Sequence, residues 1–243
     1  MHQRVLIVED DLDIARLLQV HLNELDLEVD HLSTGEGVMS QLSIQKYAIV
    51  LLDIMLPQVD GLTLCREIKT LHPKISVVML TSKSSEMDRI IGLEMGADDY
   101  ICKPCSYREF QARIKAQLRH IKLLEAQQTI EIPNGTSHPI TLGDLQVDPH
   151  CHEVSLHQKQ LDLTATEFEL MLFFAKHPNQ VFSRAQLLES VWGYDHLGYE
   201  HTVNSHINRI RTKLEKLTDQ AIIETVWGVG YKLNSKPLQQ ERL

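Results

Sequence analysis

Several apolar runs in the first half of the sequence stop at residues that could do chemistry. The side chains that follow these runs are Glu9, Asp10 and Asp11, then Asp53, then Thr81 and Ser82, and finally Lys103. Carboxylates grouped at one place suit a hard cation such as Mg²⁺. A lysine and a hydroxyl beside them could neutralise phosphoryl oxygens, and a carboxylate can then act as the nucleophile that accepts the phosphoryl group.

The apolar runs are typical of strands that alternate with helices. Strands are expected at 5–8, 28–31, 49–52, 77–80 and 100–101, and helices at 12–22, 36–45, 62–71, 86–95 and 106–124. This alternation predicts right-handed βαβ units, and therefore an α/β fold with a doubly wound, five-stranded parallel sheet. Ligand sites in such sheets lie at the carboxyl ends of the strands, so the polar residues should meet on one rim.

Each acidic residue also has a purely structural explanation. An aspartate after a strand commonly forms a turn or caps a helix, and the cluster Glu9 to Asp11 could cap the first helix. The convergence of four strand ends on one rim favours a site over a coincidence of caps.

Four motifs in this half carry a family resemblance. Glu9-Asp10, LLDIMLP..DG around Asp53, VVMLTSK and GADDYICKP together resemble the receiver domain of two-component response regulators over residues 4–121. The resemblance implies a flavodoxin-like domain, not an enzyme, in which Asp53 accepts a phosphoryl group from a sensor histidine kinase and may lose it by slow self-dephosphorylation. It implies that Mg²⁺ is held by Glu9, Asp10, Asp53 and the carbonyl of Met55. Lys103 would hold the phosphoryl oxygens, and its bond to Pro104 would be cis. Thr81 and Tyr100 would form a switch.

Cys102 and Cys105 form a C-x-x-C at a strand-to-helix junction. This is the context of a thioredoxin-like redox pair, and a helix N-terminus would lower the pKa of Cys105. Alternatively, Cys105 is a small apolar residue where the family usually has an aromatic one. If the cysteines formed a redox pair, a rival function would be a redox-tuned DNA-binding protein. A second rival rests on Asp53 instead of the cysteines: a Mg²⁺-dependent phosphohydrolase, although Met55 stands where such enzymes carry a second acid.

Length, charge and hydropathy limit the possible number of domains and the location of the protein. The 243 residues predict two domains, and the net charge of −9 divides into −6 for residues 1–139 and −3 for residues 140–243, so neither half is basic overall. No apolar run reaches the ~20 residues that span a bilayer, and the N-terminus lacks a signal-peptide pattern, which predicts a cytoplasmic protein without a membrane partner. The predicted boundaries are 1–122 for the receiver, 123–138 for a linker, 139–235 for a second domain and 236–243 for a tail.

The second half has a different pattern. Short strand-like segments from Ile140 predict a small antiparallel sheet, and three helices and a hairpin around Gly228 follow. Thr164 and Glu167 predict a capping box. In the third helix, four basic residues and one acidic residue lie between His201 and Lys216. The patch is either a nucleic-acid site or the solvated face of an amphipathic helix.

LTATEFELMLFF, FSRAQLLESVWG, TVNSHINRIRTKLE and TVWGVGYKL resemble the α+β winged helix-turn-helix domain of OmpR/PhoB-type response regulators. The resemblance implies that the helix at 202–217 enters the major groove of promoter DNA, with Arg209 as the best base reader, and that the hairpin forms a wing near the minor groove. Many relatives have arginine where this chain has Asn208 and Trp227. The implied DNA contacts are Thr202, Asn204, Ser205, His206, Asn208, Arg209, Arg211, Lys213, Thr225 and Trp227.

The same resemblance implies a homodimer when the receiver is phosphorylated, with RNA polymerase as a further partner. It pairs Arg89 with Glu109, and Asp98 or Asp99 with Arg113, across the dimer. The implied interface residues are Arg89, Glu94, Asp98, Asp99, Glu109, Arg113 and Lys115. Glu109 and Arg113 are four apart on one helix, so they could instead pair within the chain.

Overall fold

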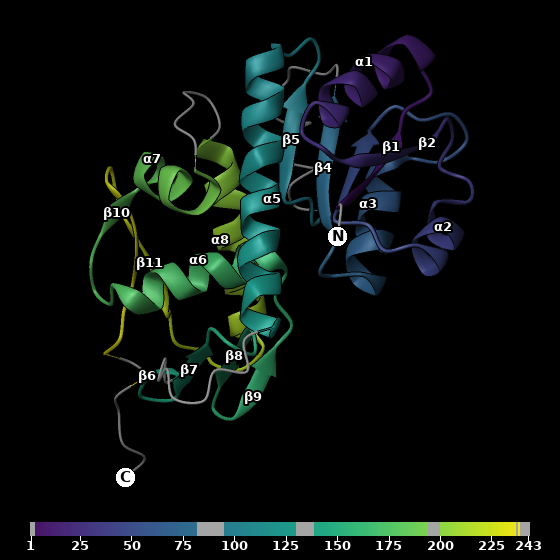
Figure 1. Cartoon of the computed structure of the whole chain (residues 1–243). Helices are drawn as coiled ribbons and strands as arrows, with labels where there is room; N and C mark the ends of the chain where they lie inside the picture. Colours follow the sequence, from purple (N-terminus) through teal and green to yellow (C-terminus); the bar gives the residue numbers. More distant parts are fainter. Residues whose placement is uncertain (1–2, 82–94, 130–138, 194–199, 237, 239–243) are drawn as a thin grey trace. The chain divides into compact units, whose positions relative to one another are not determined.

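The computed structural model describes residues 3–81, 95–129, 139–193, 200–236 and 238. The chain forms two compact units, Met1–Leu118 and Arg119–Leu243 (Figure 1). The helix expected at 86–95, with Arg89 and Glu94, lies almost entirely outside the described residues. Within the described ranges, no helix is long and apolar enough to cross a membrane.

The first unit contains a parallel sheet of five strands in the order β2-β1-β3-β4-β5. The strands are β1 (Arg4–Val8), β2 (Glu28–Leu32), β3 (Ile49–Asp53), β4 (Ser76–Thr81) and β5 (Asp99–Cys102). Every residue of β3 and β4 is buried, as expected for central strands of a sheet covered on both faces. The strand order reverses between β1 and β3, which places the carboxyl ends of both strands at a topological switch point. The predicted doubly wound fold is confirmed.

The described helices of this unit are α1 (Leu12–Asn23), α2 (Val38–Ile44), α3 (Gly61–Leu71) and α5 (Tyr107–Thr129). Asp11 caps α1 and Asp60 caps α3, each by accepting hydrogen bonds from two backbone amides of the first turn. Helix α5 continues through the first part of the predicted linker, because residues 123–129 contain neither glycine nor proline and the first breaker is Pro133.

The second unit begins with an antiparallel sheet of β6 (Ile140–Leu142), β7 (Leu145–Asp148), β8 (Glu153–Leu156) and β9 (Lys159–Leu161). The helices that follow are α6 (Ala165–Lys176), α7 (Arg184–Leu187), the π-helical turn η1 (Leu188–Trp192) and α8 (Glu200–Glu215). Strands β10 (Phe182–Ser183), β11 (Ile223–Val226) and β12 (Gly230–Leu233) form a second sheet in the order β10-β12-β11. This is the predicted winged-helix arrangement, with β11 and β12 as the wing.

Local sequence explains how these elements begin and pack. The capping box predicted at Thr164 and Glu167 is present, and Ser183 caps α7. On α8 the predicted apolar stripe, which includes Val203, Ile207 and Leu214, is buried. Gly230 lets β10 approach β12, since a Cβ there would lie 1.9 Å from the carbonyl oxygen of Phe182.

Candidate functional site

Three carboxylates meet at the switch point of the first sheet. Asp53 ends β3 with 5% of its surface exposed, Glu9 follows β1 and is buried, and Asp10 is exposed. One carboxylate oxygen from each residue lies within 4.8 Å of the others. A buried cluster of carboxylates open to solvent on one side fits the oxygen ligands of Mg²⁺. The residues predicted from sequence are therefore brought together, with Met55 immediately beyond Asp53.

Lys103 joins two of these carboxylates. Its Nζ lies 2.7 Å from Asp53 Oδ2 and 2.5 Å from Glu9 Oε2, and the Lys103–Pro104 peptide bond is cis, as predicted. Burial alone would lower the pKa of Lys103, but its hydrogen bonds to Asp53 and Glu9 outweigh burial and raise that pKa. Burial raises the pKa of Glu9, although Lys103 opposes the shift. The lysine therefore stays charged beside Asp53.

Gly61 lets the start of α3 lie close to the end of β3. Its amide lies 3.3 Å from the carbonyl oxygen of Ile54, and a Cβ at this position would lie 2.2 Å from the carbonyl oxygen of Asp53. Any larger residue would push α3 away from the end of β3. The glycine in the motif DG is thus needed for the backbone approach and not only for a turn.

The two predicted switch residues lie on the neighbouring strands β4 and β5. Thr81 ends β4, and its carbonyl accepts a hydrogen bond of 2.6 Å from the Lys103 amide. Tyr100 on β5 is 2% exposed. A cavity of about 620 Å³ opens over the site, and its lining includes Asp10, Asp53, Met55, Lys103 and Cys105. Asp53 therefore faces an opening of the receiver.

The predicted reactivity of Cys105 is not supported. Burial, followed by the nearby charge of Glu109, raises the pKa of Cys105, whereas a reactive thiolate needs a lowered one. Cys102 and Cys105 are both free thiols. Desolvation has a larger effect on this pKa than the position near the start of α5. The structure therefore favours Cys105 as a small apolar residue over Cys105 as a member of a redox pair.

Four of the residues predicted at a dimer interface form ion pairs within the receiver: Asp98, Asp99, Glu109 and Arg113. Asp98 is buried and lies 2.8 Å from Lys69 Nζ, so this aspartate is corrected from an interface residue to a structural one. Arg113 lies 3.2 Å from Asp99 and 3.1 Å from Glu109. The intrachain alternative for Glu109 and Arg113 is therefore what the structure shows, because a fully buried guanidinium needs nearby carboxylates. Lys115 is exposed.

Two predicted DNA contacts on α8 face the interior instead. Thr202 and His206 are both fully buried. The His206 Nδ1 atom lies 2.8 Å from the Thr202 carbonyl oxygen, and its ring packs edge-on against Trp192. These positions flank the apolar stripe of α8, and that buried face is wider than the stripe of aliphatic residues alone. Ser205 is also buried but shares a side of the helix with Asn208, and its role stays a prediction.

Arg209 and Lys213, also predicted to contact DNA, bind a buried carboxylate. Glu167 on α6 is fully buried, with Arg209 Nε 2.8 Å from its Oε1 and Lys213 Nζ 2.6 Å from its Oε2. Burial alone would raise the pKa of Glu167, but the charges of Arg209 and Lys213 hold it below its usual value. Arg209 thus joins α6 to α8, since a buried carboxylate requires partners. Its role as a base reader stays a prediction.

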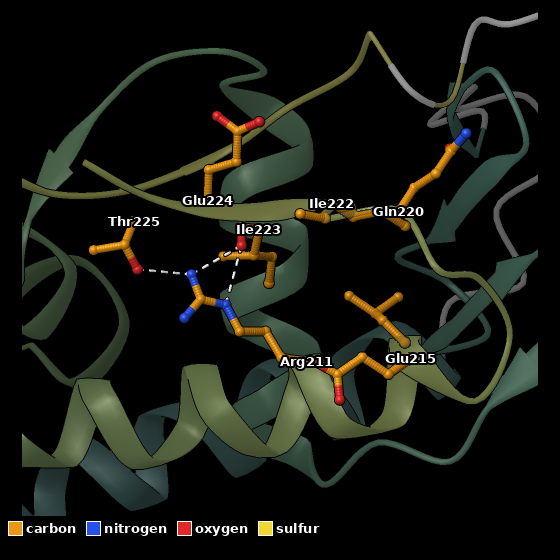
Figure 2. Close-up of a pocket in the computed structure, with 9 residues that line it drawn as sticks. Arg211, Glu215, Gln220, Ile222, Ile223, Glu224 and Thr225 are labelled. Carbon is orange, nitrogen blue, oxygen red and sulfur yellow. Dashed lines mark hydrogen bonds between the residues drawn. The ribbon is translucent and has the colours of Figure 1, made fainter. Parts of the chain in front are cut away.

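Arg211 joins α8 to the wing, as Figure 2 shows. Its Nε and Nη2 donate to the carbonyl of Ile223 at 3.0 and 2.9 Å, and Nη2 also donates to the hydroxyl of Thr225. Asn204 on α8 accepts hydrogen bonds of 2.8 Å from both Arg184 and the hydroxyl of Tyr231. These predicted DNA contacts therefore fix the wing and α7 against α8.

Several polar residues of α8 remain open to solvent. Asn208 and Thr212 are exposed and lie one helical turn apart on one side of α8, and the exposed Lys216 directly follows the helix. Trp227, between β11 and β12, is 90% exposed. Sequence reasoning named Asn208 and Trp227. Glu167 was predicted only as part of a capping box, because its ion pairs are formed with Arg209 and Lys213, which lie far away in the sequence.

The comparisons with known proteins match both units. The family model "Response regulator receiver domain" matches residues 5–115, and "Transcriptional regulatory protein, C terminal" matches residues 158–233. The chain is 37% identical over 242 residues to "Alkaline phosphatase synthesis transcriptional regulatory protein PhoP" of Bacillus subtilis, which covers 99% of this chain and 100% of that protein. It is 38% identical to "Transcriptional regulatory protein SrrA" of Staphylococcus aureus over 238 residues, 97% of each chain.

A solved structure of a RitR mutant shares the fold. The TM-score is 0.72 at 24% sequence identity, over 96% of this chain and 99% of that one. Two family matches in this order, together with two relatives aligned over nearly the whole length, agree with the geometry of both units. The chain therefore belongs to the OmpR/PhoB-type two-component response regulators, with a receiver domain followed by a DNA-binding winged-helix effector domain.

Proposed function

We propose that this chain is a phosphorylation-switched transcription regulator. A sensor histidine kinase transfers a phosphoryl group to Asp53, the receiver then dimerises, and the effector domain binds promoter DNA in the cytoplasm and acts on RNA polymerase. The observation that carries the proposal is the pairing of Asp53 with Lys103 at 2.7 Å inside a carboxylate cluster. The printed names of both full-length relatives describe transcriptional regulation, which supports the output.

The transfer step uses the two oxygens of Asp53. The Met55 amide donates to Oδ1 at 3.1 Å and Lys103 donates to Oδ2 at 2.7 Å, which fixes the carboxylate. One carboxylate oxygen forms a bond to phosphorus while the phosphorus–nitrogen bond to the kinase histidine breaks. The electron pair of that bond stays on the imidazole, which takes up a proton. Lys103 neutralises the phosphoryl oxygens as they approach.

Magnesium is the proposed cofactor. Glu9, Asp10, Asp53 and the carbonyl of Met55 would hold the ion, which supplies positive charge to the phosphoryl oxygens when bound. The chain accepts the phosphoryl group without turning over a second substrate, apart from slow self-dephosphorylation. The phosphohydrolase alternative lacks support because the side chain of Met55 offers no second acid.

The response to phosphorylation is proposed to be a population shift. Thr81 ends β4, and Tyr100 is buried on the neighbouring strand β5. The proposed switch is a movement of the threonine towards a phosphoryl oxygen together with a change in the position of the tyrosine. A receiver that samples both arrangements is shifted towards the one that binds the phosphoryl group better. That arrangement is the one proposed to dimerise.

The DNA contacts are proposed to come from the open side of α8. Asn208 and Thr212 are exposed, whereas Arg209 is held by Glu167. An asparagine amide can bond both donor and acceptor groups of an adenine edge, and Lys216 can bind phosphate. We therefore assign base reading to Asn208 rather than to Arg209.

The acceptor chemistry is tested by labelling with radioactive acetyl phosphate. We expect label in the presence of Mg²⁺, strong loss of labelling when a chelator removes the metal, and release by hydroxylamine, which cleaves acyl phosphates. Asp60→Asn is the matched control, because Asp60 is a nearby aspartate that only caps α3, and it should label normally. Equal labelling with and without the metal would contradict the proposed site, and so would a label that resists hydroxylamine.

A further inference from the structure

The cavity beside Asp53 is larger and more apolar than a phosphoryl group alone requires. Its volume is about 620 Å³, which is in the range of sites that enclose a small organic molecule. Part of its lining is the acceptor site, with Asp53 and Lys103. The lining also includes a set of apolar side chains, namely Ile14, Leu17, Leu18, Leu80, Ile101 and Pro104. The cavity therefore offers apolar surface next to the acceptor carboxylate.

Two segments bring this apolar surface to the outer part of the receiver. Helix α1 contributes Ile14, Leu17 and Leu18, and the segment after β5 contributes Pro104 and the half-buried Cys105. Leu17 is 56% exposed although it lines the cavity. A molecule that filled the cavity would therefore cover apolar surface that is now in contact with water, and this burial favours binding.

Cys105 limits how much of the cavity is filled by the protein itself. Its side chain is a free thiol, which packs as a small hydrophobic group. An aromatic ring at this position would place several more atoms in the space that the thiol leaves open. Cys105 lines the same cavity as Asp53 and Lys103, so this space is continuous with the place where a donor must present its phosphorus atom.

We propose that the cavity binds the leaving group of a small phosphodonor, and that it favours acyl phosphates with an alkyl chain longer than that of acetyl phosphate. One carboxylate oxygen of Asp53 forms a bond to phosphorus while the bond from phosphorus to the acyl oxygen breaks. The electron pair of that bond leaves with the alkyl carboxylate, and no proton is transferred.

The alkyl chain lies against Leu17 and Cys105, which makes Cys105 a residue that determines specificity among small donors. The inference rests on the proposed acceptance of a phosphoryl group by Asp53. It deepens that function, because it names the chemical class of donor that the same site selects.

The first test compares the rates at which radioactive acetyl phosphate and radioactive butyryl phosphate label the full chain in the presence of Mg²⁺. Both donors release an alkyl carboxylate of similar basicity, so a difference in rate at equal, low concentration reports contact with the alkyl chain. Full burial of one methylene corresponds to about a fourfold gain. Because the cavity is open to solvent, we expect about a fourfold preference for butyryl phosphate in total. Equal rates, or a faster reaction of acetyl phosphate, would overturn the inference.

The second test measures the same ratio of rates in variants of the cavity lining. Cys105→Phe, which fills the space, should remove the preference, whereas Cys105→Ala leaves the space open and should keep it. Leu17→Ser changes an exposed position of α1, so it should fold normally, and it should lower the preference by about half. A general loss of phosphoryl acceptance changes both rates together and leaves the ratio unchanged.

The outcomes separate the inference from the function on which it rests. A preference that survived both Cys105→Phe and Leu17→Ser would overturn the assignment of the cavity to the alkyl chain. Absence of label from both donors, or equal labelling of Asp53→Asn and the original protein, would instead refute phosphoryl acceptance by Asp53.

Discussion

Replacing Asp53 with asparagine is expected to abolish phosphoryl acceptance and every response that depends on it. An amide is a far weaker nucleophile than a carboxylate, and no other acid of the described cluster has the hydrogen bonds that Asp53 receives from Met55 and Lys103. The variant should remain folded, because Lys103 retains its bond to Glu9. Labelling with acetyl phosphate, oligomeric mass and DNA affinity should each be the same with and without the phosphodonor.

Asp60→Asn is the control for this substitution, since it makes the same chemical change at an exposed helix cap. The control should respond to the phosphodonor like the original protein. If Asp53→Asn still dimerised in response to acetyl phosphate, the acceptor would be another residue. Circular dichroism of both variants establishes that they fold alike.

Replacing Glu167 with glutamine is expected to destabilise the effector domain by about 3 kcal/mol, because it leaves Arg209 and Lys213 without the carboxylate that binds both. The amide keeps the shape of the side chain and can still accept from the Thr164 amide, so the loss reports mainly the charge. Urea unfolding followed by near-ultraviolet circular dichroism of the buried Trp192 measures the effect. Glu215→Gln, an exposed acid on α8, should change stability little.

The same carboxylate gives the effector domain a defined acid sensitivity. The pKa of Glu167 is lowered in the folded state, so its contribution is complete above the ordinary glutamate pKa of about 4.3 and is lost as pH falls through the lower folded value. The difference in stability between the original protein and Glu167→Gln should therefore shrink in acid. A difference that stayed constant with pH would show that packing, and not charge, sets the effect.

Much of the receiver could be predicted from sequence because its information is local. Each strand ends where an apolar run meets a polar residue, and the rule for parallel sheets brings Glu9, Asp10, Asp53 and Lys103 to one rim. The cap at Asp11, considered as an alternative to a site, coexists with the carboxylate cluster, since Asp11 caps α1 while Glu9 and Asp10, which precede it, belong to the cluster.

Sequence was least informative where a charge finds its partner far away along the chain. Arg209 is basic, polar and on the recognition helix, and only the fold shows that Glu167 lies against it. Asp98, just before β5, likewise pairs with Lys69 of α3. For Cys105, the opposing effects of helix position and burial could not be weighed without the packed structure. Periodicity identifies a buried face but not which polar residues at its margin are enclosed, as Thr202 and His206 show.

The central claim is that a phosphoryl group on Asp53 controls DNA binding. The most direct measurement determines DNA affinity and oligomeric mass on one preparation of the full chain, with Mg²⁺ present throughout, before and after addition of acetyl phosphate. The account predicts conversion to a dimer together with tighter binding, and linked binding of two effector domains can raise affinity without any new protein–DNA contact. Affinity and mass that stay unchanged while Asp53 is fully phosphorylated would contradict the account.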